Sequence, residues 1–176
     1  MIEHGSIQLR ALEKDDLPHL KEWRNRKDFR DNFREYRELS MDHQESWYTT
    51  VKDKNSPHQM FAVIEKKTGK LIGAAGLCYI HNVYRNADLS FYIGKDGLYA
   101  DDLYGKDTVF ALLTYGFKHL GLKRIWCELY ETDSMKQKLL GGMGFTKEGT
   151  LRCNTFKNGK FLNGHIFAIL DTEFHA

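Results

Sequence analysis

Apolar and polar residues follow two different periods along this chain. Runs that alternate, or that are rich in β-branched and aromatic residues, predict strands over 6–12, 60–64, 71–80, 85–93, 124–130, 145–155 and 161–170. Helical spacing of the apolar residues predicts helices over about 15–26, 40–55, 104–120 and 133–140. Asp15 or Asp16, Ser40 and Asp133 are placed to begin three of them. The pattern therefore predicts strands interspersed with helices, which is typical of an α/β or α+β protein.

The connections between these strands predict a mixed sheet. The short link 66–70 joins two strands as an antiparallel hairpin, and the Asn158-Gly159 pair suits the tight turn of a second, terminal hairpin. The strand that ends at Ile93 is followed by a long helix and then by the strand 124–130. A crossover of this length makes two neighbouring strands parallel. We expect a mixed, mostly antiparallel central sheet flanked by helices.

The overall composition is that of a globular protein. Apolar residues make up 41% and charged residues 28% of the 176, and this length suits one domain over 1–176. The 26 basic and 24 acidic side chains leave a formal net charge of +2, which indicates no extensive nucleic-acid or membrane surface. The sequence shows no long apolar span and no signal-like segment, so we expect a cytoplasmic protein that does not insert into membranes.

The cysteines and histidines suggest neither disulfides nor a metal centre. Cys78, Cys127 and Cys153 are odd in number, widely spaced and set in apolar strand-like runs. They are expected to be reduced thiols of the core. The eight histidines are scattered without the spacing of metal ligands, so we expect no metal to be required.

The segment 103–109 joins a glycine turn to the start of an apolar helix. It follows the strand that ends at Ile93, and Gly105 lies where the helix begins. The first backbone N–H groups of a helix have no partner within it, so they can converge on one phosphate. The segment predicts an anion-binding turn, and the alternative is a helix-start glycine with no binding role.

The segment 23–37 interleaves cationic and aromatic residues and has little periodicity. It could line the mouth of a substrate pocket, with arginines meeting anionic groups and rings forming walls. The candidates for substrate contact are Arg24, Phe29, Arg30, Phe33 and Tyr36. Such a segment can also bind single-stranded nucleic acid, but its acidic residues weaken that interpretation. A solvated loop over the core is the third possibility.

The order of these elements and several short motifs are similar to the GNAT superfamily of N-acetyltransferases, and within it to the RimJ/RimL-type branch. The resemblance covers nearly the whole chain. Its motifs are Leu9-Arg10, Trp23-Arg24-Asn25, Tyr104-Gly105-Lys106, the stretch 120–124, Gly144-Phe145 and the stretch 149–152. It implies a GNAT-like sheet and an enzyme that moves an acetyl group from acetyl-CoA to a primary amine, of a small molecule or a protein N-terminus, by direct attack.

The resemblance also implies where acetyl-CoA binds. The end of the strand before the glycine turn pairs with the pantetheine amides, and the turn holds the pyrophosphate. A further polar position, usually asparagine, follows the strand after the long helix. In this sequence these positions are Phe91, Tyr92, Ile93, Tyr104, Gly105, Lys106, Asp107, Thr108, Val109 and Asp133.

Three features depart from the family pattern. Asp107 stands at a usual glycine position and would repel a pyrophosphate unless its side chain turns away or caps the helix. The loop 94–103 is longer than is common and carries Asp96, Asp101 and Asp102, which would suit a cationic amine or a solvated loop. The tyrosine that usually protonates the leaving thiolate corresponds to Leu140.

Asp88 and Ser90 are the catalytic candidates that alternation places on one face of the strand, together with Tyr92. An attacking amine must be neutral, so Asp88 is the candidate base and Ser90 a partner for water or thiolate. Asp88 could instead pair with Arg85 or a helix end.

The alternative function is a non-catalytic acyl-CoA or nucleic-acid binding module. The amine acceptor cannot be read from these residues, and exposed sheet edges make a homodimer possible.

Overall fold

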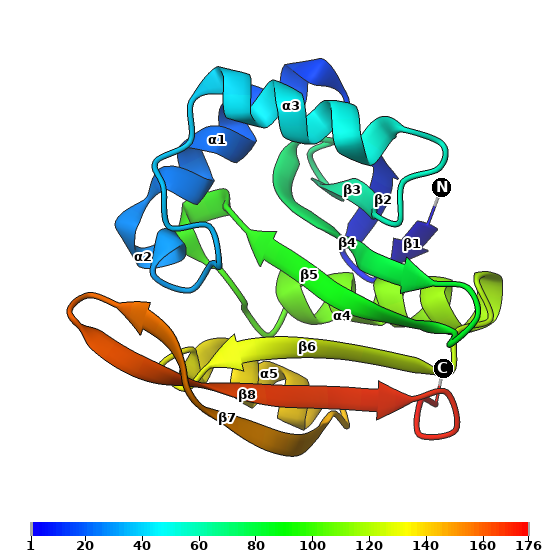
Figure 1. Cartoon of the computed structure of the whole chain (residues 1–176). Coiled ribbons are helices and arrows are strands. Elements are labelled where there is room, and N and C mark those ends of the chain that lie inside the picture. Colours follow the sequence, from blue (N-terminus) through cyan, green and yellow to red (C-terminus); the bar gives the residue numbers. More distant parts are fainter. Residues whose placement is uncertain (1, 176) are drawn as a thin grey trace.

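The computed structural model describes residues 2–175 and centres on an eight-stranded sheet, with helices on both faces (Figure 1). The strand order is β1-β2-β3-β4-β5-β6-β8-β7. The strands are β1 Ile2–His4, β2 Ile7–Ala11, β3 Gln59–Glu65, β4 Leu71–His81, β5 Asn86–Ile93, β6 Arg124–Tyr130, β7 Thr146–Lys157 and β8 Lys160–Leu170. The helices are α1 Leu17–Asn25, α2 Lys27–Arg30, α3 Met41–Lys52, α4 Tyr104–Thr114 and α5 Ser134–Gly142.

The pairing of β5 with β6 is parallel, and the other pairings between named strands are antiparallel. This confirms the mixed, mostly antiparallel sheet expected from the hairpins and the crossover. The β5–β6 ladder covers only 86–88 against 124–126. Beyond Asp88 the two strands diverge toward their carboxyl ends (Figure 1). A gap between strands therefore opens in the middle of the sheet.

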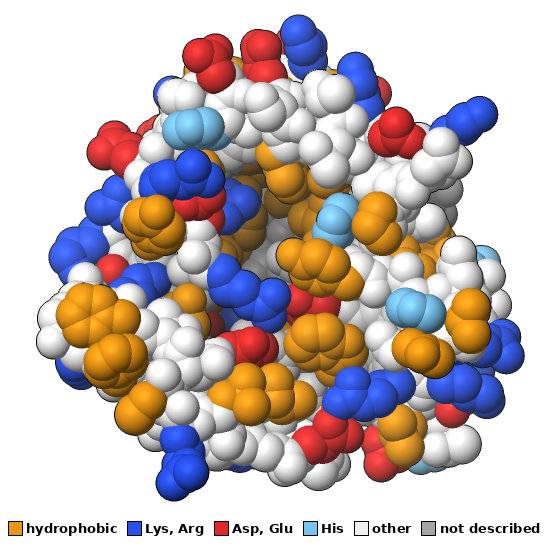
Figure 2. Space-filling view, viewed as in Figure 1, with side chains coloured by type: hydrophobic (Ala, Val, Ile, Leu, Met, Phe, Trp, Pro, Cys, Tyr) orange, Lys and Arg blue, Asp and Glu red, His pale blue; other side chains and the backbone are white. Residues whose placement is uncertain are grey.

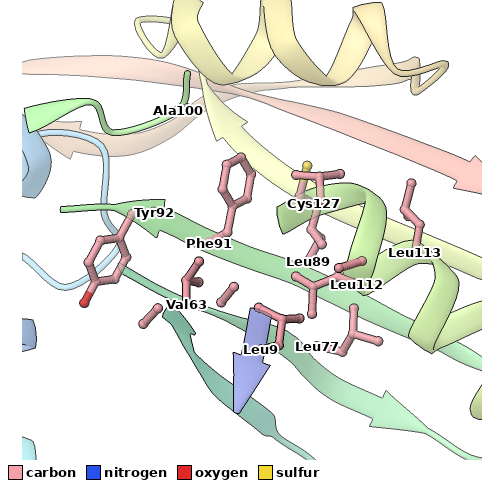
Figure 3. Packing of buried hydrophobic residues seen from close by; sticks show 14 of the residues in the cluster. Leu9, Val63, Leu77, Leu89, Phe91, Tyr92, Ala100, Leu112, Leu113 and Cys127 are labelled. Carbon is pink, nitrogen blue, oxygen red and sulfur yellow. The ribbon is translucent and has the colours of Figure 1, made fainter. Parts of the chain in front are cut away.

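The apolar core lies between the sheet and the helices. Helix α4 packs on β1, β2, β4 and β5, while α1 packs on α3 and α3 reaches β3. Leu112 and Leu113 of α4 are fully buried against strand residues such as Leu9 and Leu77 (Figure 3). The helical spacing of apolar residues along α4 therefore produces one continuous buried face.

Most helices and strands lie where the capping residues and apolar spacing predicted them, with small differences at their ends. Ser40 accepts a hydrogen bond from the His43 N–H at 3.2 Å and caps α3 as expected. Asp16 does not cap α1 with its side chain, because its carboxylate holds Arg10 through two 2.7 Å hydrogen bonds. The N-terminal strand β1 was not predicted. The expected helix 104–120 changes after Thr114 to a π-helical segment, Tyr115–His119.

The cysteines differ from the expectation of three core thiols. Cys127 is buried and Cys78 partly so, but Cys153 is exposed. Cys153 lies in a register shift of β7, with a φ of 49°, and the irregular strand turns its side chain away from the core. No helix within 2–175 is long and apolar enough to cross a membrane.

Candidate active site

A cavity of about 520 Å³ lies at the divergence of β5 and β6. Its floor comes from β5, β6 and α5, and its rim from the segment 32–39 and from α3. Figure 2 shows the hollow at the centre of this face, with apolar side chains inside and charged side chains at its edge. Beyond Asp88 the strands β5 and β6 no longer pair with each other, so side chains from both strands line the opening.

Asp88 is the buried carboxylate of this cavity. It lies at the last paired position of β5, opposite Trp126, and only 6% of its surface is exposed. Burial raises its pKa to about 6, and the Arg34 guanidinium, 3.1 Å from Oδ2, limits the rise. Arg34, rather than Arg85, is the partner of Asp88. A carboxylate with this pKa is largely ionised at pH 7 and can still take up a proton.

The alternation along β5 places Ser90 beside Asp88 in the cavity wall. Tyr92, two residues further, is buried and packs edge-on against the rings of Phe29 and Phe33. Its ring and that of Phe91 point to different sides of the strand (Figure 3). Burial raises the pKa of Tyr92, so its hydroxyl stays protonated. Asp88 and Ser90 are therefore together at the cavity, and Tyr92 belongs to the packing beneath it.

The basic and aromatic segment 23–37 contributes only in part as expected. Arg24 and Phe33 line the cavity. Phe29 does not, because its ring is buried in the core against Tyr92 and Tyr99. Arg30 also lies outside the lining, and Tyr36 is 78% exposed. The segment presents instead Arg34, Glu35 and Arg37.

Lys136 is the cavity residue that sequence reasoning missed. It lies on α5, and only 7% of its surface is exposed. Its ammonium is 4.6 Å from the ring centroid of Tyr99 and 4.8 Å from that of Phe91. Lys136 precedes Leu140 by four residues, so both lie on one face of the helix and both line the cavity. The four-residue spacing from Leu140 was the sequence signal that could have predicted Lys136 as a cavity residue.

The amino end of α4, the expected pyrophosphate turn, is capped by the chain itself. The Asp101 carboxylate accepts hydrogen bonds from the N–H groups of Leu103, Tyr104 and Gly105 at 3.1, 3.0 and 2.8 Å. Asp107 turns away from this end and accepts two hydrogen bonds from Ser6, from its N–H at 2.7 Å and its hydroxyl at 2.6 Å. Asp107 therefore does not face the place expected for the pyrophosphate. The Asp101 carboxylate occupies that place instead, because it accepts the hydrogen bonds of the first N–H groups of α4.

The remaining members of this turn are divided between surface and core. Thr108 and Val109 are fully buried on the inner face of α4, and Gly105 is buried as well. Lys106 is exposed to solvent. The Tyr104 hydroxyl donates to Glu65 on β3. The polar side chains of the turn thus point to neighbouring elements, apart from Lys106.

Tyr99 fills the edge of β5 that faces the gap. Its N–H and C=O pair with the C=O and N–H of Ile93 at 2.8 and 2.9 Å. Gly94 donates instead to Ile72 of β4, so the polar groups of Ile93 face the opposite edge, toward β6. The Tyr99 hydroxyl donates to Asp133 at 2.7 Å. The loop 94–103 therefore occupies the strand edge, the helix end and Asp133 at once.

The arrangement of the donor-side residues does not fit an acetyl-CoA bound in the way the family resemblance implies. The backbone groups of Ile93 and the first N–H groups of α4, which were expected to bind pantetheine and pyrophosphate, are already hydrogen-bonded to residues of loop 94–103. Within residues 2–175 no group of three or more His, Cys, Asp or Glu side chains is arranged to hold a metal ion.

The fold combines a mixed sheet that splits between two parallel strands with a cavity at the split. Comparison with known proteins assigns the family. The model of the acetyltransferase (GNAT) domain matches residues 6–146. The chain belongs to this acetyltransferase (GNAT) domain family.

Individual relatives are distant. An uncharacterized N-acetyltransferase p20 of Bacillus licheniformis is 28% identical over 65% of this chain and 63% of its own length. YoaA, an uncharacterized N-acetyltransferase of Bacillus subtilis, is 26% identical over 62% of this chain and 61% of its own length. The chain thus spans less than two thirds of the length of these two relatives.

The spermidine N(1)-acetyltransferase of Vibrio cholerae is 24% identical over 97% of this chain and 96% of its own length. A crystal structure of spermidine N-acetyltransferase from that organism, in complex with CoA and spermine, superposes with a TM-score of 0.87 at 24% identity, covering 96% of this chain and 97% of the other. This likeness establishes the fold.

Proposed function

We propose that this protein transfers an acetyl group from acetyl-CoA to a primary amine bound in the β5–β6 cavity, with Asp88 as the proton acceptor. The observation that carries the proposal is a buried carboxylate with a pKa of about 6 at the split of a GNAT sheet. Acetyl-CoA supplies the activated acetyl group of this reaction. The amine of a small molecule or of a protein N-terminus is the acceptor.

Asp88 is suited to prepare the acceptor. A primary amine arrives as an ammonium ion at neutral pH and becomes a nucleophile only when it loses a proton. Asp88 is mostly ionised above pH 6, and Arg34 orients it through Oδ2. Ser90 lies in the same wall and could hold a water between the amine and the carboxylate. Leu140 offers no hydroxyl, so the role of the usual tyrosine must fall to another group or to solvent.

A nucleic-acid binding module is less well supported, because the arginines of the basic segment are largely compensated. Arg34 pairs with Asp88, and Arg37 pairs with Glu35 at 2.7 Å. Arg26 and Lys27 pair in the same way with Asp28 and Asp31. A phosphate backbone needs free cations along a continuous surface.

The resemblance to the RimJ/RimL-type branch, a cytoplasmic location and a homodimer stay predictions. The Vibrio cholerae spermidine N-acetyltransferase has a dodecameric structure. In this chain β1 and β7 are the edges of the sheet and could meet a second copy.

The test of the proposed function is free-thiol release from acetyl-CoA with a panel of primary amines. We expect turnover with at least one amine and formation of its N-acetyl product by mass spectrometry. Binding of CoA, measured by a rise in melting temperature, without turnover of any amine would make the protein an acyl-CoA binder instead.

A further inference from the structure

Two basic side chains of the cavity, Arg24 and Lys136, form no close ion pair with a carboxylate among the described residues. Within residues 2–175 the Lys136 ammonium forms no hydrogen bond or ion pair. Asp133 accepts a hydrogen bond from the Lys136 backbone N–H, and the carboxylates of Asp133 and Asp88 act on the ammonium only from a distance. The Arg24 Nε is buried with no hydrogen-bond partner among the described residues. The other arginines of the cavity, Arg34 and Arg37, are each paired with a carboxylate.

Arg24 and Lys136 converge on one ring. The Arg24 guanidinium lies 4.8 Å from the centroid of Phe33, and the Lys136 ammonium lies 5.6 Å from it. We call these two side chains the cation pair. They come from α1 and α5, which are far apart in the sequence, and both line the same cavity. Two like charges on one aromatic ring at the wall of a cavity form a site for a negative group.

The cost of this arrangement indicates that it serves a ligand. Burial lowers the pKa of Lys136, and the nearby carboxylates of Asp133 and Asp88 offset this effect only in part. Cation–π contacts compensate only a part of the lost hydration. An anion between the cation pair would supply hydrogen bonds to both groups and favour the charged form of Lys136.

We propose that the cation pair of Arg24 and Lys136 binds an anionic group, a phosphate or a carboxylate, carried by the amine acceptor. This rests on the proposed function, because it assigns the acceptor class of the same cavity. An amino sugar phosphate or another amine with a negative group fits the site. A polyamine, which brings several positive charges, does not, so the acceptor class differs from that of the spermidine acetyltransferases that share the fold.

The first test measures anion binding without acetyl-CoA. The probes are O-phosphoethanolamine and inorganic phosphate, with chloride at equal ionic strength as the baseline. We expect a saturable rise in melting temperature for the wild type, and its loss in Lys136→Met and in Arg24→Gln. The matched control is Arg26→Gln, which removes an arginine of the same segment that lies outside the cavity lining and pairs with Asp28, and it should keep the rise.

The proposal is overturned if neither probe stabilises the wild type, or if Lys136→Met responds as the wild type does. A response to CoA but to neither probe would assign the cation pair to the donor rather than to the acceptor. Lys136→Met keeps most of the length of the unbranched side chain and removes its charge, so folding should be preserved even if Arg24→Gln fails to fold.

The second test compares matched acceptors by kcat/KM, namely O-phosphoethanolamine against ethanolamine and glucosamine 6-phosphate against glucosamine. The anionic member should be preferred at least tenfold by the wild type, and the preference should vanish in Lys136→Met. A preference for spermidine over all of them would contradict the proposal. Turnover of no amine, with anion binding intact, would refute the proposed function and leave the anion site standing.

A different observation concerns the donor side. Loop 94–103 makes three contacts at the expected donor site. The backbone of Tyr99 pairs with Ile93 at the edge of β5, and the Tyr99 hydroxyl donates to Asp133. The Asp101 carboxylate accepts from the N–H groups at the amino end of α4. A peptide group resembles a pantetheine amide, and a carboxylate on helix N–H groups resembles a phosphate. We infer that this loop is a built-in plug of the donor site, which must leave before acetyl-CoA binds.

The plug is tested by the affinity for CoA, measured by calorimetry. Asp101→Ala removes the carboxylate from the helix end, and Asp102→Ala removes an exposed neighbouring acid of the same loop. We expect Asp101→Ala to bind CoA about tenfold more tightly than the wild type and Asp102→Ala to bind it equally. Equal or weaker binding by Asp101→Ala, relative to Asp102→Ala, would overturn the inference.

Hydrogen exchange separates a plug from a failed donor site. Addition of CoA should increase deuterium uptake of a peptide over 95–103, because the Tyr99–Ile93 pairing is broken. Tight CoA binding with unchanged or reduced uptake in this peptide would refute the plug and leave the proposed function intact. Binding of CoA to neither the wild type nor Asp101→Ala would refute both.

Discussion

Replacement of Asp88 by Asn tests the proposed chemistry most directly. The substitution keeps the size of the side chain and its contact with Arg34, but removes the proton-accepting oxygen. Loss of a positioned general base reduces rates by about 10²- to 10⁴-fold. We expect a fall of this size in kcat/KM for the best amine acceptor.

The pH profile of the wild type should carry the signature of this residue. The pKa of Asp88 is raised from 3.8 to about 6, chiefly by burial. The carboxylate form is the active one, so kcat/KM should fall about tenfold for each pH unit below 6. Asp88→Asn should lose this acidic limb.

The stability of Asp88→Asn can be worked from the same pKa. A rise from 3.8 to about 6 corresponds to about 3 kcal/mol by which the fold disfavours the ionised carboxylate at pH 7. The native state binds more protons than the unfolded state between these pH values, so stability falls as the pH rises from about 4 to 6. Asn removes that cost, while Arg34 is about half exposed and can be hydrated. The variant should therefore stay folded, and a loss of activity would not come from unfolding.

The assay is free-thiol release between pH 5 and 9, with Glu128→Gln as the matched control. Glu128 is the second carboxylate near Arg34, at 4.0 Å, and its loss should cost less than tenfold and keep the acidic limb. If Asp88→Asn keeps its rate within threefold and its pH profile unchanged, Asp88 is not the base.

Three other substitutions test the packing and the caps. Lys136→Met should raise the free energy of unfolding by about 1 kcal/mol in urea titration, because a buried cation is replaced by an apolar chain; a clear decrease would contradict its description as uncompensated. Ser40→Ala should cost about 1 kcal/mol through loss of the α3 cap, and an unchanged midpoint in the same titration would show that the cap is dispensable. Gly94→Ala should lower the melting temperature by several degrees in a calorimetric scan, since its Cβ would lie 1.9 Å from the Trp23 ring, and a wild-type value would mean that the ring moves freely.

The elements of this protein follow from local sequence. The strand and helix periods, the Ser40 cap and the Asn158-Gly159 turn act over a few residues, so they can be read along the chain. The length of the crossover also sufficed to predict that β5 and β6 are parallel. Asp88 and Ser90 could be placed on one strand face, because alternation is a property of the strand itself.

The composition of the cavity was decided by the tertiary structure. Phe29 and Phe33 are equivalent in the sequence pattern, but one ring is buried in the core and the other lines the cavity. Arg24 and Lys136 meet at that ring only because α1 and α5 are brought to the same opening of the sheet.

At the expected acetyl-CoA site, too, the sequence did not predict which groups meet, although they are close together in the chain. Asp101 lies next to the helix end in the sequence, but whether its carboxylate or a phosphate takes the three N–H groups depends on how Tyr99 anchors the loop to Ile93 and Asp133. The sequence alone determined which local structures form. Only the folded chain decided which charges meet and which have no counter-ion, because charge balance in a cavity is a property of all the elements around it.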